Sequence, residues 1–262
     1  MCGIAGYSLD AESRVDRTLA AQALLAGIAE RGADAAGYAH RGPTPAVTIH
    51  KQRTGATALL DEVELPASTG EALVHVRDYT KGHPTLLANN HPIRHGSVVG
   101  IHNGVIANDE EIFAHHGIEH AEPGMTVDSE AIFALVERFG ADHSALEQLR
   151  GTMATAWMDE RSPGGLHLAR GVARPLWIGR ARRELFFAST KTALEVVEST
   201  LRLTLRKREV AEGRLFHIGA GAILAEKRFR PDPSYRNGTT VQPAATPHEG
   251  VSCLAKLAAL AL

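Results

Sequence analysis

The sequence has very little cysteine and no broad excess of charge. Only two cysteines, Cys2 and Cys253, occur among 262 residues, too few for the disulfide framework of small secreted domains, so both are expected to be free thiols. The 28 Lys and Arg residues are balanced by 30 Asp and Glu residues. Because this balance offers no broad positive field, the sequence argues against a nucleic-acid partner and favours a small-molecule substrate.

Long apolar runs are also absent. No stretch reaches the roughly 20 apolar residues that a membrane-spanning helix needs, and the opening MCGIAGYSLDAESR meets charged residues too early for a secretory signal peptide. The sequence therefore predicts a cytoplasmic protein with no membrane partner. Its 14 histidines show no zinc-ligand spacing, so we expect surface or core histidines, no metal and no other cofactor.

The composition that remains is that of an ordinary globular protein, with 44% hydrophobic and 22% charged residues. The length permits one large domain or two small ones, and we favour one. From Arg228 to Gly250 the sequence is rich in Pro, Thr, Asn and Ser, which build cores poorly. We therefore expect a domain over 1–227 and a Pro-rich tail over 228–262, whose last apolar segment could dock on the body or on a partner.

Short β-like runs occur in two clusters, with helical patterns between them. The first cluster lies at 3–9, 36–40, 46–51, 72–77 and 98–102, and the second follows Gly151. Helical patterns begin near Ser13, with Asp16 completing a capping box, near Asn108, with Glu111 in the same role, and near Asp128 and Lys191. This order favours an α+β fold with antiparallel sheets over a doubly wound parallel one.

Cys2 is the first residue with a chemical role to consider, because it follows the initiator Met1 and precedes the small Gly3. A small second residue permits removal of Met1, which leaves a thiol and a free α-amine on one residue. An α-amine with a pKa of about 7.7 to 8.0 is substantially neutral near physiological pH and can serve as the base for that thiol. Taken alone, Cys2 could equally be a small apolar residue that starts a strand.

Several motifs occur together with Cys2 in a fixed order. They are MCGIAGY at the start, RGADAAG from Arg31, HVRDYTKG from His75 and IHNGVIAN from Ile101, followed by VDSEAI, GTMATAWMD and LFFAST. In these motifs the sequence resembles the class II glutamine amidotransferases, N-terminal nucleophile hydrolases that include the glutaminase domains of glucosamine-6-phosphate synthase and phosphoribosyl pyrophosphate amidotransferase. The resemblance implies a four-layer αββα sandwich of antiparallel sheets, in agreement with the clustered strands.

The resemblance also implies a reaction and a nucleophile. Cys2 would attack the side-chain amide of L-glutamine and release ammonia, and water would then hydrolyse the thioester to glutamate. Asn103 and Gly104 would donate hydrogen bonds to the oxyanion. The two letters Asn-Gly by themselves more often mark a hairpin turn.

The charged ends of glutamine need partners of opposite charge. By the resemblance, Arg77 with help from Thr80 would hold the α-carboxylate, and Asp128 with the backbone of Gly104 would hold the α-ammonium. Arg31 would support the site without reacting. Simpler alternatives are a surface ion pair for Arg77, a helix cap for Asp128 and an interaction with a helix dipole for Arg31.

Two features depart from the family's pattern. Asp78 and Tyr79 take positions that are usually aromatic or small, and Lys81 follows Thr80, so the loop that closes over glutamine is expected to behave differently. The acceptor domain that follows the glutaminase in relatives is not recognised, and no P-loop pattern occurs. We therefore expect a separate ammonia-accepting synthase as partner, with a stand-alone hydrolase of another γ-glutamyl amide or a catalytically silent regulatory subunit as alternatives.

Overall fold

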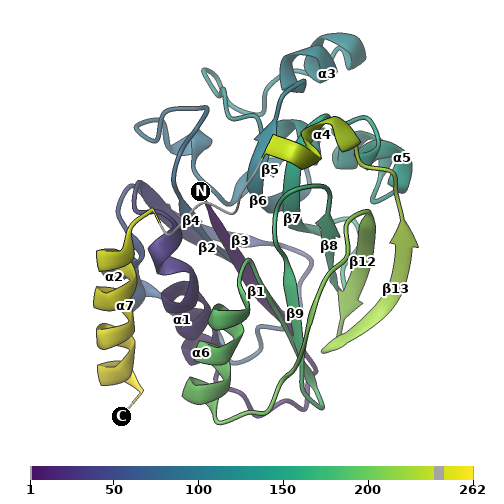
Figure 1. Cartoon of the computed structure of the whole chain (residues 1–262). Helices are drawn as coiled ribbons and strands as arrows, with labels where there is room; N and C mark the ends of the chain where they lie inside the picture. The colour runs from purple at the N-terminus through teal and green to yellow at the C-terminus, as the bar shows by residue number, and fades with distance from the viewer. Residues whose placement is uncertain (1, 239–244, 262) are drawn as a thin grey trace.

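Two antiparallel sheets lie face to face between two layers of helices (Figure 1). The computed structural model describes residues 2–238 and 245–261. Every pairing between its named strands is antiparallel. The predicted α+β class and the αββα sandwich are confirmed.

The first sheet has seven strands and the second has six. In spatial order the first contains β11 (Arg206–Glu209), β9 (Trp177–Arg180), β10 (Glu184–Ala188), β1 (Gly3–Leu9), β4 (Glu71–Arg77), β2 (Ala35–Arg41) and β3 (Thr48–Gln52). The second contains β13 (Ala222–Arg228), β12 (Arg214–Gly219), β8 (Leu166–Arg170), β7 (Gly151–Asp159), β6 (Val98–Ile106) and β5 (Ile93–His95).

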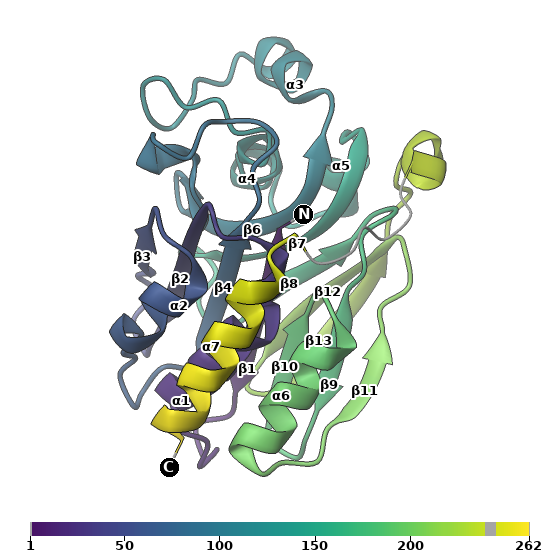
Figure 2. The same ribbon diagram turned by 60° about the vertical axis from the view of Figure 1, so that its left-hand side comes forward.

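The helices cover the two outer faces of the sandwich (Figure 2). The α-helices are α1 (Arg17–Ile28), α2 (Ala56–Leu59), α3 (Asp109–His116), α4 (Glu130–Phe139), α5 (His143–Leu146), α6 (Lys191–Leu201) and α7 (Pro247–Leu260). The 3₁₀ turns are η1 (Ala29–Arg31), η2 (Leu60–Glu62), η3 (Leu87–Asn89) and η4 (Pro233–Gly238). Helices α1 and α6 pack together on the first sheet, and α4 packs on the second.

Three apolar clusters fill the spaces between the four layers. In β1, Ile4 faces the second sheet, whereas Ala5 and Tyr7 face the helices. All seven residues of β1 are buried, because a strand in the middle of a covered sheet has no solvent face. This burial fixes the position of the residue before β1, which is Cys2.

The first helix begins later than the sequence pattern predicts. Asp16 is itself the N-cap of α1, and its side chain accepts a hydrogen bond from the backbone N–H of Leu19. Ser13 instead donates its hydroxyl to the buried Glu184 at 2.6 Å. The predicted Ser13–Asp16 capping box is therefore wrong, because a tertiary contact uses the serine that local spacing assigned to the helix.

The C-terminal helix α7 packs against α1 and η1. Its Cys253 and Leu257 are buried, and Glu249 accepts a hydrogen bond from the backbone of Thr57 at 2.7 Å. Parts of the predicted tail, 239–244 and residue 262, lie outside the described residues, and the boundary after residue 227 stays a prediction. No helix among the described residues is long and apolar enough to cross a membrane.

Candidate active site

The predicted site residues meet where β1 begins, β4 ends and β6 faces them from the second sheet. One small cavity is lined by Cys2, Arg77, Thr80, Gly104 and Asp128. Its volume is about 10 Å³, which barely holds one water molecule. The structure therefore brings these five residues together in a closed state, and a substrate the size of glutamine needs part of the wall to move.

Cys2 lies at the start of β1, with its thiol half-buried. Its Sγ donates to the backbone oxygen of Asp78 at 3.5 Å. Burial raises the pKa of the thiol to about 11, although the positive charges of Arg77 and Arg31 act to lower it. A thiol with this pKa is a poor nucleophile at neutral pH and requires a base, or further positive charge, to ionise.

Arg31 lies in η1 at the end of α1 and is buried. Its Nε donates to the backbone oxygen of Cys2 at 3.0 Å, so the guanidinium fixes the backbone of the nucleophile. The neighbouring Gly32 has no room for a Cβ, which would lie 2.4 Å from the carbonyl of Arg77. This close contact brings the end of η1 against the end of β4.

Asn103 and Gly104 lie within β6, opposite Ala154 and Met153 of β7, so the alternative of a hairpin turn is excluded. The Nδ2 of Asn103 is buried and finds no hydrogen-bond partner among the described residues. Gly104 has φ of +151°, and a Cβ there would lie 1.8 Å from the carbonyl oxygen of Thr152. The strand thus presents an open amide donor next to a position that only glycine can occupy.

Arg77 is 2% exposed, which excludes a surface ion pair. Its guanidinium donates to Asn90 Oδ1 at 2.5 Å and to the backbone oxygens of Lys81, at 2.8 Å, and Gly82. No carboxylate lies within 4 Å of it in the described part of the chain. A buried guanidinium with neutral acceptors alone is suited to receive a carboxylate from a ligand.

Asp128 is the buried carboxylate of the site. Its Oδ2 accepts a hydrogen bond from the backbone N–H of Ile106 at 2.6 Å. Burial raises the pKa of this carboxyl to about 6, so it is ionised at neutral pH at a cost in free energy. Helix α4 starts two residues later with Ser129 as its N-cap, and thus capping alone does not account for Asp128.

Three buried histidines lie beside the cavity, in an arrangement that no sequence pattern indicated. The rings of His75 and His91 are stacked, with their centroids 4.1 Å apart. His102 Nδ1 lies 2.8 Å from the hydroxyl of Ser129. Burial lowers the pKa of His75 and of His102 to about 3, and that of His91 well below its ordinary value. All three are therefore neutral at physiological pH and add no charge to the site.

Arg174 is a further buried residue at the site that the sequence did not single out. It lies in the connection from β8 to β9 and is 8% exposed. Its pKa is lowered by burial and raised by interaction with Cys2. A single arginine in a loop has no local pattern that would distinguish it from a solvated one, so only the three-dimensional structure identifies it.

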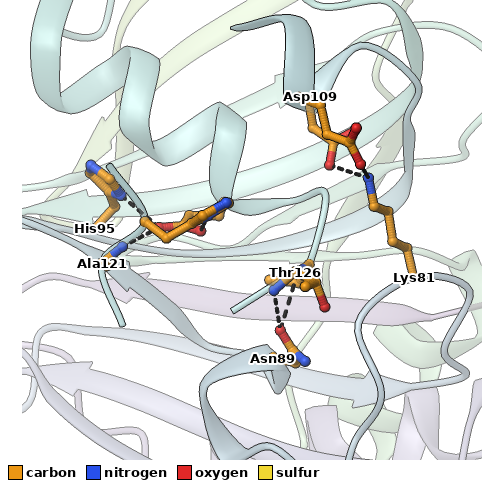
Figure 3. Close-up of polar contacts among 10 residues, drawn as sticks. Lys81, Asn89, His95, Asp109, Ala121 and Thr126 are labelled. Carbon is orange, nitrogen blue, oxygen red and sulfur yellow. Dashed lines mark hydrogen bonds and ion pairs between the residues drawn. The ribbon is translucent and has the colours of Figure 1, made fainter. Parts of the chain in front are cut away.

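The segment after Arg77 is tied to its surroundings by polar contacts (Figure 3). Lys81 Nζ lies 2.6 Å from Asp109 Oδ2 and 3.1 Å from Glu110 Oε1, both in the first turn of α3. Farther along the segment, Asn89 Oδ1 accepts hydrogen bonds from the backbone N–H groups of Thr126, at 2.9 Å, and Val127, at 3.2 Å. These contacts hold the segment closed over the cavity.

A second group of contacts anchors the loop that leads to Asp128. The carboxylate of Glu130 is fully buried and lies 2.9 Å from His95 Nδ1 and 2.7 Å from His120 Nδ1 (Figure 3). It also accepts a hydrogen bond from the backbone N–H of Ala121 at 2.6 Å. Because Glu130 is two residues from Asp128, this cluster fixes the position of the site carboxylate.

Replacing Lys81 with methionine is expected to lower KM for the substrate about fivefold at low salt, because the closed cavity has no room for a substrate and the segment must open to admit one. The Lys81–Asp109 pair is partly exposed, with side chains 36% and 10% exposed, so it stabilises the closed loop by about 1 kcal/mol. Steady-state kinetics at low and high ionic strength measure this, and the variant should lose the salt dependence of the wild type. Glu110→Gln is the control, because Glu110 is 87% exposed and its loss should change KM less than twofold. An unchanged KM in Lys81→Met contradicts the role of the pair.

Residues 82–196 match the family described as "Glutamine amidotransferase domain". Three curated relatives are glutamine–fructose-6-phosphate aminotransferases (isomerizing). The one from Haemophilus ducreyi is 32% identical over 246 residues, which cover 85% of this chain and 36% of the relative. Those from Methanothermobacter thermautotrophicus and Escherichia coli K12 are 31% and 32% identical, covering 65% and 74% of this chain and 32% of each relative. The chain thus spans about a third of the length of these relatives.

Two solved structures share the fold. Glutamine phosphoribosylpyrophosphate amidotransferase from B. subtilis, complexed with ADP and GMP, has a TM-score of 0.70 and 22% identity over 88% of this chain and 50% of its own. A structure described as the allosteric regulatory enzyme of purine biosynthesis has a TM-score of 0.67 and 23% identity, with the same coverage. At these identities the likeness establishes the architecture.

Proposed function

Since this chain belongs to the class II glutamine amidotransferases, we propose that it hydrolyses the side-chain amide of L-glutamine to glutamate and ammonia through a thioester on Cys2. The observation that carries this proposal is the cavity shared by Cys2, Arg77, Thr80, Gly104 and Asp128. These residues come from distant parts of the sequence, and together they supply a nucleophile, a cation for a carboxylate and an anion for an ammonium group.

In the proposed reaction, removal of Met1 leaves the α-amine on Cys2, and this amine takes the thiol proton. The thiolate attacks the amide carbon, and the oxyanion that forms accepts hydrogen bonds from Asn103 Nδ2 and the backbone N–H of Gly104. The amine returns the proton to the leaving nitrogen, so ammonia departs and a γ-glutamyl thioester remains. Water then attacks the thioester, gives its proton to the amine, and releases glutamate and the free thiol.

Substrate binding in this proposal uses opposite charges at the two ends of glutamine. The guanidinium of Arg77, with the hydroxyl of Thr80, holds the α-carboxylate, and the carboxylate of Asp128 holds the α-ammonium beside the backbone of Gly104. Arg31 contributes indirectly, because its hydrogen bond to the carbonyl of Cys2 fixes the nucleophile. Both charged partners are buried, so their interactions with substrate are weakly screened.

The acceptor of the ammonia and the cellular compartment are part of the same proposal. The relatives named above are aminotransferases, and we propose that here the ammonia passes to a synthase on a separate chain in the cytoplasm. Residues 1–227 would form the glutaminase domain, with 228–262 as an extension. A subunit of this kind is expected to be slow alone and faster with its partner, whereas a stand-alone hydrolase is not.

The test is turnover of glutamine by purified protein whose intact mass shows that Met1 is absent. Release of equal amounts of glutamate and ammonia, with covalent labelling of Cys2 by a glutamine-mimicking electrophile, is the expected result. Asparagine and a γ-glutamyl anilide serve as comparison substrates. Turnover of the anilide in preference to glutamine points to a different γ-glutamyl amide, and no turnover with no label in the processed protein favours a silent regulatory subunit.

A further inference from the structure

The connection from β8 to β9 crosses from one sheet to the other at the end of the sandwich that holds Cys2. On the side of the second sheet, Val172 pairs with Thr152 and its carbonyl accepts the N–H of Met153 at 3.2 Å. Met153 lies opposite Gly104 in the adjacent strand. The connection therefore passes directly beside the strand that carries the proposed oxyanion donors.

On the side of the first sheet, the connection ends close to the start of β1. Leu176 is buried in the core between the sheets, and Trp177 begins β9 opposite Ala188. Ala188 in turn lies opposite Ala5 in β1. Arg174, in the middle of the connection, is thus held between the strand of the nucleophile and the strand of Gly104.

The side chain of Arg174 is buried, and no carboxylate among the described residues forms an ion pair with it. Its Nε finds no partner among the described residues, and its Nη1 donates to the carbonyl oxygen of the preceding Ala173 at 3.4 Å. Ala173 has φ of +60° and its N–H donates to Glu212 at 3.0 Å. An unpaired buried charge costs free energy, and so does an alanine in the left-handed region of backbone conformation. Such costs are typical of positions that are kept for function.

The charges around Cys2 do not balance. Among the described residues, the buried charged side chains that interact with it are three guanidinium groups, Arg31, Arg77 and Arg174, and one carboxylate, Asp128. The neighbouring histidines are neutral, and Lys81 is paired with Asp109. Under the proposed function glutamine brings one charge of each sign, for Arg77 and Asp128, so two positive charges remain for the sulfur and the oxyanion.

Arg31 and Arg174 differ in what surrounds them. The less buried carboxylate of Glu30 interacts electrostatically with Arg31, and that of Asp34 interacts with Arg77. Arg174 interacts electrostatically with the thiolate form of Cys2. Arg31 uses its Nε for the carbonyl of Cys2, whereas the Nε of Arg174 makes no hydrogen bond among the described residues.

We propose that Arg174 is a positioning residue that acts through Cys2, its guanidinium stabilising the thiolate that attacks glutamine and the negative charge of the intermediates formed on that sulfur. The part that concerns the thiolate rests on the structure, and the part that concerns the intermediates rests on the proposed function. The proton that leaves the thiol still goes to the α-amine. Arg174 supplies charge and takes no proton.

The test compares Arg174→Met, which keeps the length and removes the charge, with Arg174→Lys, which keeps the charge. The rate at which iodoacetamide alkylates Cys2 is measured against pH without substrate, and peptide mass spectrometry separates Cys2 from Cys253. Arg174→Met should shift the alkylation profile to higher pH and lower the rate at pH 7.5 about tenfold, the effect of one pH unit. Arg174→Lys should restore the rate to within about threefold. Arg170→Gln is the matched control, because Arg170 lies nearby in β8 but pairs with Glu209 at 2.7 Å.

An alkylation profile in Arg174→Met that coincides with the wild type overturns the proposal. A faster alkylation would mean that the substitution only exposes the thiol, and this also overturns it. If Arg174→Met does not fold, Arg174→Lys is the test. A tenfold loss of the alkylation rate in this variant, which keeps the positive charge, overturns the proposal. With glutamine, kcat should fall while KM stays within twofold. A shifted profile in a protein that hydrolyses no glutamine would keep the thiolate role and reject the proposed function.

Discussion

Replacing Cys2 with alanine is expected to abolish glutamate formation, by at least about a thousandfold, in protein from which Met1 has been removed. Alanine is small enough to keep the processing of Met1, so the variant loses the sulfur and retains the α-amine. Under the proposed mechanism the remaining groups still bind glutamine, but no nucleophile is left to form the thioester. Glutamate and ammonia are quantified after long incubation, with intact mass spectrometry to verify the new N-terminus.

Cys253→Ala is the matched control for this experiment. Cys253 is the second cysteine of the chain, fully buried in α7, and burial raises the pKa of its thiol to about 12. It lies outside the cavity, and a smaller side chain there should lower stability by about 1 kcal/mol or more with activity retained. Wild-type turnover in Cys2→Ala, or loss of turnover in Cys253→Ala alone, would assign the chemistry to a different residue.

The architecture could be predicted because two independent signals agree. Short runs of apolar residues in two clusters indicate two antiparallel sheets, and the motifs from Cys2 to Asp128 indicate the αββα sandwich. The helix start at Asn108 is correct, but the capping contacts were less accurate, because Ser13 contacts Glu184 and Asn108 hydrogen-bonds to the backbone of Gln148 and Arg150. Both side chains are used by tertiary contacts that local spacing does not contain.

The site could be predicted only as far as motifs mark it. Arg77 and Asp128 stand in recognisable segments, so their meeting in one cavity was expected before the structure. Arg174 stands in a connection with no such mark, and its burial depends on how the two sheets meet. The closed loop is a similar case, since the pairing of Lys81 with Asp109 depends on where α3 begins relative to the end of β4.

Replacing Asp128 with asparagine is expected to have opposite effects on activity and stability. Under the proposed binding mode the substrate's α-ammonium loses its buried charged partner, which costs about 3–5 kcal/mol and lowers kcat/KM for glutamine by about two to four orders of magnitude. The folded protein, in contrast, no longer has to ionise a buried carboxyl. Kinetics with glutamine and urea unfolding of the same preparations measure the two effects.

The sign of the stability change follows from the direction of the pKa shift. Burial raises the pKa of Asp128 to about 6 from an ordinary value of 3.8, so the folded protein holds this proton more tightly than the unfolded chain. Above pH 6 the ionised group therefore destabilises the fold, by roughly 1–3 kcal/mol. Asp128→Asn should gain that amount at pH 7.5, and the gain should shrink as pH falls through 6 and vanish below about pH 4.

The matched control is Asp109→Asn, because Asp109 is also a buried carboxylate near the site but is paired with Lys81 at 2.6 Å. Its loss leaves the lysine without its buried partner, so that variant should lose stability at pH 7.5 and change kcat/KM only severalfold. A gain in Asp109→Asn and a loss in Asp128→Asn would reverse the assignment. If both predicted signs are observed, the Asp128 carboxylate lowers the stability of the fold and is retained for the charge that it presents to glutamine. Such a loss of stability is the expected cost of a preformed site for an ammonium group.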